Sequence, residues 1–586
     1  MQVCLKHLVG YLTLVLLVCC LQYKNVTDRI FIVDDAYIVR GDAYQHNSPY
    51  WKFFSDQCLQ DDYISNYYLS AIVPTGLRLL FSFFAKFFSP PKFTTIFSYL
   101  LSFGFILAMA ASARRISGWW GAFLTVFFSV GFLTRNFIFG AAISRSFGYF
   151  ICALAIYALL QKSLIILAIL SCIGILFYPP SAAFVGMCFA LLLLTKFDWE
   201  AKKKSLIRAF LSLFLLLLFL CLLALPQLSS GKFYGKRLSP RDSDKYQEVG
   251  ENGRYSPTDR GIVELNLFQT FFSGLRRTFL IKKPIGSFFN RRQQTSASKR
   301  TSRGNKHKSK SYGLRGIVFF VSILIAISSI FLRPFRKSKI DLISFLHPGS
   351  IYFFAAGVCF YLAVLFFPWL YMPSRYTSVS FPAFSLVFLP SLFVLSFSQN
   401  INKLRSHIQI FWLSLFLILL SGVYEYRVPR RTSMEQYSRL FNYLHNLPAK
   451  TLVAGWPLGL IDAVPYFSCK PVLLSYEMHQ VFHEDYILEM RRRMHALTAA
   501  YLSSEIEPIS KLKNEFGVTH LLVEDHYYSK RPWYFSPFKK EIEQKFEANP
   551  KENRLKFFNS LSTAIVYQQA GLKIYDLDKL KRLGFF

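Results

Sequence analysis

Six aspartates crowd one short polar segment that begins about a dozen residues beyond the first apolar stretch of the chain. They are Asp34, Asp35, Asp42, Asp56, Asp61 and Asp62. Carboxylates held beside a bilayer can accept a proton from a hydroxyl nucleophile, or hold a divalent cation next to a phosphate. No spacing within the segment is diagnostic of a metal site, so a solvated acidic loop without a catalytic role is the alternative interpretation.

Two arginines stand where apolar helices are expected to begin. Arg145 lies in the sequence Ile-Ser-Arg-Ser-Phe at 143–147, and Arg375 lies in Met-Pro-Ser-Arg-Tyr at 372–376. An arginine at such a boundary can bind a phosphate through two parallel hydrogen bonds, as a lipid phosphate would require. The alternative for each is a side chain that only extends toward the membrane surface.

The elements that must position these residues are apolar runs long enough to cross a bilayer. Hydrophobic residues make up 53% of the chain and the mean hydropathy is +0.30, which excludes a soluble globular protein. Each crossing needs about 20 apolar residues, and the runs predict a polytopic α-helical membrane protein with about eleven transmembrane helices. The runs are 5–22, 95–113, 118–133, 145–160, 163–178, 180–196, 206–226, 313–333, 349–368, 376–397 and 407–424. No small-residue cleavage site follows Cys20, so we expect the first run to be retained as an anchor.

Basic residues in the short loops predict which side of the membrane each polar segment faces. Clusters at 114–115, 202–208, 333–337 and 403–405 fall on one side together with Lys6, and that side is expected to be cytoplasmic. The outer side then receives a first loop at 23–94, a large polar loop at 227–312 and a tail domain at 425–586, after a membrane domain at 1–424. Within the first loop, residues 70–88 are expected to form an amphipathic helix at the membrane interface.

The large polar loop is strongly basic, which opposes this topology. Loops longer than roughly 60 residues escape the charge rule, so the loop is still expected outside. Its acid-free stretch from Arg291 to Lys310 is rich in serine and lysine, and it predicts a disordered tether or a contact with anionic lipid headgroups. Nucleic-acid binding is not expected.

The tail has the composition of a small soluble α/β domain. Strands are expected at 451–454, 471–474 and 518–523, with a closing hairpin formed by 563–567 and 572–575. Helical patterns cover 437–444 and 510–516. There is no glycine-rich phosphate fingerprint, so nucleotide binding is not expected. Of the ten cysteines, only Cys58 and Cys469 clearly lie outside apolar runs, and their spacing does not predict whether they pair.

The order of these parts resembles the GT-C class of membrane glycosyltransferases, which use polyprenyl-phosphate sugars as donors. More narrowly, the chain is similar to a bacterial family whose first loop carries a D-D-A-R-Q-H type motif. The matching stretches are Gly41-Asp42-Ala43-Tyr44-Gln45-His46, 60–68, 74–76, 177–180, 248–254 and 471–486. Their common order along nearly the whole chain carries the resemblance. One departure is Gly41, which stands where the family has the first acid.

This resemblance implies an inverting transfer of a sugar at the outer face. Asp42 is expected to act as the general base or as a metal ligand. If the acid missing at Gly41 were the base, either Asp42 acts alone or Asp34 and Asp35 substitute. Substrate-binding roles are expected for Gln45, His46, Asp62, Arg145, Arg375, Glu248 and Arg254, the two arginines at helix starts taking the donor phosphate. Glu248 and Arg254 are expected to cover the sugar as part of a lid, or to pair within their loop. Glu477 and His483 are expected to dock the tail.

Two other classes of function stay open at this stage. One is a transporter or flippase of a lipid-linked substrate, and the other is a non-catalytic membrane scaffold, which Gly41 favours. Few charged residues interrupt the apolar runs, whereas transporters usually carry them at the bilayer midplane, and this favours the enzyme. The expected partners are a polyprenyl-phosphate sugar donor and membrane lipids, and a divalent cation is the one cofactor considered. The family indicates a bacterial inner membrane with a cytoplasmic N-terminus and a periplasmic tail, although an endoplasmic reticulum membrane fits the same physics.

Overall fold

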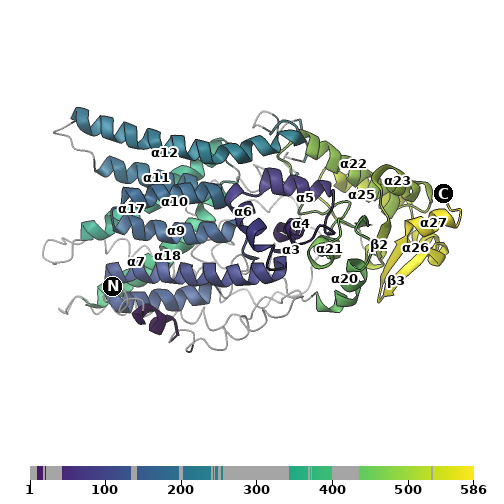
Figure 1. Ribbon diagram of the computed structural model, residues 1–586, viewed down its shortest axis with the longest axis horizontal. Helices are drawn as coiled ribbons and strands as arrows, with labels where there is room; N and C mark the ends of the chain where they lie inside the picture. The colour runs from purple at the N-terminus through teal and green to yellow at the C-terminus, as the bar shows by residue number, and fades with distance from the viewer. Residues whose placement is uncertain are drawn as a thin grey trace, which may run out of the picture.

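The computed structural model describes residues 9–16, 20, 43–133, 141–196, 202–238, 242, 245–248, 253–254, 342–366, 370, 372–398, 434–529 and 532–586. Figure 1 shows a bundle of long helices at one end and a mixed domain of helices and strands at the other, with the C-terminus on the far side of that domain. Asp34, Asp35 and Asp42 lie outside the described residues, as do the predicted spans 313–333 and 407–424.

Apolar helices of the bundle coincide with the predicted runs. They are α7 (Pro90–Leu133), α9 (Ser144–Leu160), α10 (Leu164–Phe177), α11 (Pro179–Thr195), α12 (Lys202–Ser230), α17 (Leu342–Leu365) and α18 (Ser374–Ser398). The predicted spans 95–113 and 118–133 are the two arms of α7, which is broken at Ser117 and Gly118. Gly118 has φ of 71°, a left-handed conformation that glycine adopts without a steric penalty.

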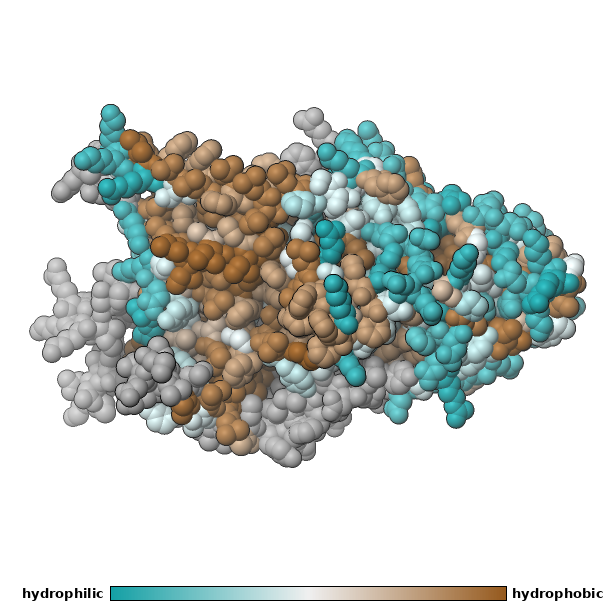
Figure 2. All heavy atoms as spheres, viewed as in Figure 1, coloured by the Kyte–Doolittle hydropathy of each residue, from teal (hydrophilic) through white to brown (hydrophobic). Residues whose placement is uncertain are grey.

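The predicted number of about eleven spans is not reached in the described part of the chain. Three helices there are long and apolar enough to cross a membrane, and they cover Pro90–Leu133, Lys203–Tyr234 and Ser374–Leu395. The helices α9, α10 and α11 are apolar but have 17, 14 and 17 residues. At a rise of about 1.5 Å per residue they are shorter than a hydrocarbon core of about 30 Å. Figure 2 shows hydrophobic side chains gathered over the bundle and hydrophilic ones over the tail.

Short helices of the first loop lie between the bundle and the tail (Figure 1). They are α3 (Ala43–Asn47), α4 (Trp51–Phe54), α5 (Tyr63–Tyr67) and α6 (Thr75–Phe84). The helix α6 falls within the segment predicted to be amphipathic, and it buries Leu77 and Phe81. Thr75, Arg78 and Ser82 share the opposite face, so the helix is amphipathic as predicted, although Leu79 and Phe83 beside that polar face are 62% and 56% exposed.

The tail domain contains a four-stranded mixed sheet in the order β1-β2-β4-β3. The strands are β1 (Val453–Gly455), β2 (His520–Glu524), β3 (Ile565–Gln569) and β4 (Leu572–Asp576), with β1 and β2 parallel and β3 and β4 forming the predicted hairpin. The strand expected at 471–474 is reduced to one bridge, Val453 to Val472. Directly after this stretch, the Ser475 hydroxyl donates to the buried Asp462 carboxylate at 2.5 Å.

Helices accompany this sheet and supply about half of the tail's buried hydrophobic side chains. They are α20 (Ser438–His445), α21 (Leu460–Ser468), α22 (Glu484–Tyr501), α23 (Glu507–Phe516), α24 (His526–Ser529), α25 (Phe538–Ala548), α26 (Lys551–Ser560) and α27 (Leu577–Arg582). The patterns expected to be helical at 437–444 and 510–516 are found as α20 and α23. The longest of these helices, α22, directly follows His483, which contacts Tyr67 of the first loop.

Candidate functional site

The helix α3 joins the bundle to the tail through its own end and the residues that follow it. The Asn47 amide donates to the Thr94 hydroxyl at 2.9 Å and to the Ala141 carbonyl at 2.8 Å, which fixes the end of α3 against the starts of α7 and α9. On the other side, the Trp51 indole donates to the Tyr466 carbonyl of the tail at 2.7 Å. Residues that follow Asp42 in the sequence are therefore held at the junction of the two parts.

Gln45 and His46, both predicted to bind substrate, lie on α3. Gln45 is buried, with 6% of its surface exposed. The His46 ring is hydrogen-bonded through Nδ1 to the Tyr68 hydroxyl. Asp42 directly precedes α3 but lies outside the described residues, so its predicted role as a base stays a prediction.

Arg145 and Arg375 begin two helices that pack together, α9 and α18. The Tyr149 hydroxyl, one turn into α9, donates to the carbonyl of Ser378, one turn into α18, at 3.0 Å. The two helices therefore start at the same end of the bundle, and Ala141 connects that end to α3. Both arginines are half-buried. The N-terminal ends of helices carry a partial positive charge, so this end of the bundle favours an anion.

The turn at Tyr178-Pro179-Pro180, part of the matching stretch 177–180, lies at the same end of the bundle. The Ser144 hydroxyl, at the start of α9, donates to the Phe177 carbonyl at 2.6 Å. Tyr178 then separates α10 from α11, and Pro179 is the first residue of α11, a position where a missing N–H costs nothing.

The Asp62 side chain makes a structural contact within the first loop. Its carboxylate caps α5 by accepting the Ser65 N–H at 2.9 Å. Burial raises the pKa of Asp62, against the lowering effect of the hydrogen bonds from Ser65. The described contacts therefore support a role in holding α5, and the predicted substrate contact stays untested.

Glu248 and Arg254 both attach the large polar loop to the tail. The fully buried Glu248 carboxylate accepts two hydrogen bonds from Arg491 of α22, each 2.7 Å long. Arg254 pairs with the Glu477 carboxylate at 2.6 Å and donates to the Glu477 carbonyl at 3.0 Å. Within the loop, the Arg254 N–H donates to the Glu248 carbonyl at 2.8 Å. These side-chain contacts of Glu248 and Arg254 run from the loop to the tail.

His483 connects the first loop, the large loop and the tail. Its Nδ1 is hydrogen-bonded to the Tyr67 hydroxyl at 3.1 Å, and its backbone forms a bridge with Arg237. The Tyr67 ring stacks on Tyr486 with centroids 3.5 Å apart. Burial, and then the charge of Arg237, lower the pKa of His483 to about 4, so the ring is neutral at physiological pH. These are the docking contacts expected for His483 and Glu477.

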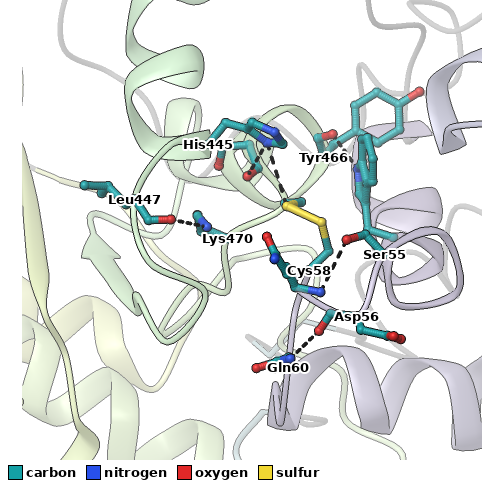
Figure 3. Close-up of a disulfide and its surroundings, with 12 residues drawn as sticks. Ser55, Asp56, Cys58, Gln60, His445, Leu447, Tyr466 and Lys470 are labelled. Carbon is teal, nitrogen blue, oxygen red and sulfur yellow. Dashed lines mark hydrogen bonds between the residues drawn. A yellow bond between two sulfur atoms is a disulfide. The ribbon is translucent and has the colours of Figure 1, made fainter.

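A disulfide between Cys58 and Cys469 joins the first loop covalently to the tail (Figure 3). Its Cα atoms are 5.1 Å apart, and the Leu59 N–H donates to the Cys469 carbonyl at 3.2 Å. Disulfides persist in oxidising compartments. The sequence left this pairing open, because the two cysteines are 411 residues apart.

Two buried carboxyl groups lie inside the tail near the ends of β1 and β2. Burial, with the charge of Glu477 adding to it, raises the pKa of Asp462 to about 7. Burial and the neighbouring charge of Asp462 raise the pKa of Glu524 to about 8. Neither residue was singled out from the sequence, and neither was Arg491, whose only signal was a run of three arginines.

The described residues contain no group of three or more histidine, cysteine or acidic side chains that could hold a metal ion. Asp42, the predicted ligand, lies outside them. A divalent cation therefore stays a prediction that rests on Asp42 alone.

No protein-family model matches the chain, and no curated protein matches it. Solved structures of the Archaeoglobus fulgidus oligosaccharyltransferase are similar to it. The apo form has 12% identity and a TM-score of 0.44, with 88% of this chain and 70% of that chain covered. A complex with an inhibitory peptide and a dolichol-phosphate has 11% identity and a TM-score of 0.45, with 88% and 69% covered. A form tethered to an acceptor peptide has 11% identity and a TM-score of 0.45, with 93% and 72% covered. A likeness this distant carries no activity or residue role over to this chain.

Proposed function

We propose that this protein is a GT-C type membrane glycosyltransferase, which moves a sugar from a polyprenyl-phosphate donor to a hydroxyl group at the outer face of the membrane. The observation that supports this most is the meeting of three features at one end of the bundle. Arg145 and Arg375 begin packed helices there, and α3, which follows Asp42 in the sequence, is fixed to the same end by Asn47. A cationic end beside a candidate base suits a phosphate-bearing donor.

The chemistry that this arrangement supports is a displacement at the anomeric carbon of the sugar. The acceptor oxygen forms a bond to that carbon, the bond to the donor phosphate breaks, and the acceptor proton passes to the Asp42 carboxylate. Arg145 and Arg375 stabilise the negative charge that the leaving phosphate develops. Attack from the face opposite the leaving group inverts the anomeric configuration. A divalent cation held by Asp42 would supply further charge neutralisation when bound.

The remaining predicted residues then position the site. His46, held by the Tyr68 hydroxyl, orients Asp42 or contacts the acceptor, and Asp62 caps the short helix α5. Gln45, on α3 next to His46, contacts the substrate. Glu248 and Arg254 fix the large loop on the tail, so that the loop can cover the sugar from a rigid base. The Cys58–Cys469 disulfide favours an oxidising compartment for this side, either a periplasm or an endoplasmic reticulum lumen.

The test is a mass-spectrometric comparison of membrane glycolipids and surface glycans in cells that express wild-type protein or Asp42→Asn at equal levels. Asp56→Asn is the matched control, because Asp56 is an exposed acid of the same loop. Loss of one defined sugar in Asp42→Asn alone is expected. Unchanged glycans in Asp42→Asn and in a deletion strain would refute the transferase and leave transport or a scaffold role, the latter favoured by Gly41.

A further inference from the structure

Trp533 presents an exposed indole ring on the surface of the tail. It is 53% exposed, although tryptophan is mostly buried in folded proteins. The next two residues are buried, and the rings of Tyr534 and Phe535 stack with their centroids 4.6 Å apart. The Tyr534 hydroxyl is hydrogen-bonded to Nδ1 of the buried His479 at 3.1 Å. The segment that carries the exposed ring is therefore anchored in the core of the tail.

A second aromatic ring lies beside Trp533. The centroids of the Tyr476 and Trp533 rings are 5.8 Å apart, and their planes are inclined by 44°. Tyr476 is half-buried and packs edge-on against Tyr534, with centroids 5.2 Å apart. The Arg254 guanidinium lies over the Tyr476 ring, 4.6 Å from its centroid. Tyr476 thus links the exposed indole to the place where the large polar loop is attached to the tail.

A carboxylate borders the two rings. Glu477 follows Tyr476 directly, and its side chain is 39% exposed. Arg254, whose side chain is 5% exposed, pairs with this carboxylate at 2.6 Å and so fixes its direction. A carboxylate held in this way can still accept hydrogen bonds from hydroxyl groups, and bonds to a charged acceptor are stronger than neutral ones. Trp533, Tyr476 and Glu477 together form what is called the aromatic platform below.

The composition of the aromatic platform matches a sugar ring. A pyranose has faces of C–H groups and a rim of hydroxyl groups. The negative face of an indole ring attracts polarised C–H groups, and a carboxylate accepts hydrogen bonds from the hydroxyls. A lipid surface or a protein partner is marked instead by a wide apolar patch. The face of the tail in Figure 2 is mostly hydrophilic, and in the described part of the tail only four large hydrophobic side chains are exposed.

We propose that the aromatic platform is a carbohydrate-binding site. Trp533 stacks on one face of a pyranose ring, and Glu477 accepts hydrogen bonds from its hydroxyl groups. The inference goes beyond the proposed function, because the site binds a glycan without transferring a sugar and needs neither the donor nor Asp42. Arg254 connects the platform to the large polar loop, so the bound glycan lies at the attachment of that loop to the tail.

Saturation-transfer difference NMR tests the proposal on the full-length protein in lipid nanodiscs. The protein is irradiated, and the signal shows which protons of a bound sugar lie against it. The probes are oligosaccharides of different chemistry, namely maltohexaose, chitotetraose and a tetramer of galacturonic acid. Binding of at least one probe is expected. The strongest signals should come from the C–H groups of one pyranose face, because only that face lies on the indole ring.

Substitutions of exposed side chains assign the signal to the platform. Trp533→Ala should fold as the wild type does, because changes at exposed positions affect stability little. It should weaken binding of the probe by at least about fivefold, since the stacking contact is lost. Trp533→Phe keeps a ring and should retain part of the affinity and the signal from one face. Glu477→Gln keeps the shape of the side chain but not its charge, and should also weaken binding. Leu488→Ala, at a residue of α22 that is 45% exposed, is the control and should bind as the wild type does.

Three results would overturn the site. The first is the absence of a signal with all of the probes, and the second is equal binding by the wild type and Trp533→Ala. The third is quenching of Trp533 fluorescence by brominated lipid, measured as the difference between the wild type and Trp533→Phe, which would place the ring in the membrane. None of them bears on the proposed transferase, which the Asp42→Asn comparison tests separately.

Discussion

Glu248 and Arg491 form a bidentate ion pair that fastens the large polar loop to α22 of the tail. The two hydrogen bonds are each 2.7 Å long, and the Glu248 side chain is fully buried while Arg491 is 31% exposed. The pair raises the pKa of Arg491 through its hydrogen bonds to Glu248. Because a buried carboxylate without its partner is costly, the pair holds the loop in one position.

Removing the arginine of this pair should release the loop. Arg491→Ala leaves the Glu248 carboxylate buried without its partner, which should cost about 3–5 kcal/mol of the free energy that docks the loop. Limited proteolysis of the full-length protein in detergent should then cleave the loop around residues 245–254 much faster than in the wild type.

The neighbouring Arg492 provides the control for that experiment. Arg492 is 51% exposed and pairs with Glu489 on the same helix, so Arg492→Ala should cost no more than about 1 kcal/mol. Equal proteolysis rates in the two variants would contradict a docking role for the Glu248–Arg491 pair.

The disulfide between Cys58 and Cys469 should be found by peptide mapping under non-reducing conditions. Cys58→Ser should lower the unfolding temperature of the full-length protein, because a typical disulfide contributes about 2–4 kcal/mol. Cys172→Ser, which alters a free cysteine in α10, is the control and should leave the peptide map unchanged. Free thiols at both Cys58 and Cys469 in protein isolated from the membrane would contradict the pairing.

The stability of the tail should fall as the pH rises from 6 to 9. In the unfolded chain the carboxyls of Asp462 and Glu524 titrate near pH 4, whereas in the folded tail their pKa values are raised to about 7 and about 8. The folded state therefore holds protons that unfolding releases, and this contribution to stability is lost as the pH passes through the raised pKa values.

Glu524→Gln should flatten that pH dependence, because glutamine does not titrate. The measurement is a thermal melt of the full-length protein at several pH values, with Glu543→Gln on α25 as a control. A wild-type melting temperature that is constant or rises across this range would show that the two buried carboxyls do not govern it.

Membrane-impermeant thiol labelling should place the loop and the tail on one side. Lys245→Cys, at a side chain that is 73% exposed, should react from outside intact cells or spheroplasts. Lys196→Cys, at the end of α11 on the opposite end of the bundle, should react only after the membrane is opened. Labelling of Lys245→Cys only after opening would contradict the predicted topology and require a new count of the spans.

Local features of this chain could be predicted from its sequence. The hairpin of β3 and β4 follows from two alternating runs around Gly571, whose φ of 78° suits the tight turn. The starts of α9 and α18 follow from the apolar runs behind Arg145 and Arg375. The number of spans was harder to predict from the sequence. An apolar run of 14 residues such as α10 does not by itself distinguish a helix that crosses the membrane from a buried one.

Long-range contacts could not be predicted in the same way. Glu248 and Arg491 are 243 residues apart, and a run of three arginines on a helix does not reveal which one faces a distant carboxylate. The raised pKa of Glu524 depends on burial, which cannot be inferred from a single acidic residue at the end of a strand. Asp42, the centre of the predicted chemistry, stays a prediction outside the described residues.

Binding of a polyprenyl phosphate to purified protein tests the central claim most directly. Wild-type protein, Arg375→Ala, Arg145→Ala and the control Arg115→Ala, an exposed arginine far along α7 from α3, would be titrated in nanodiscs with a fluorescent short-chain polyprenyl phosphate. Loss of a charged hydrogen bond of about 1.5–3 kcal/mol should weaken binding by about tenfold or more in Arg375→Ala, and also in Arg145→Ala. Arg115→Ala should bind as the wild type does. Equal affinity in all four proteins, each shown to be folded, would contradict a donor phosphate site at the helix starts and with it the proposed transferase.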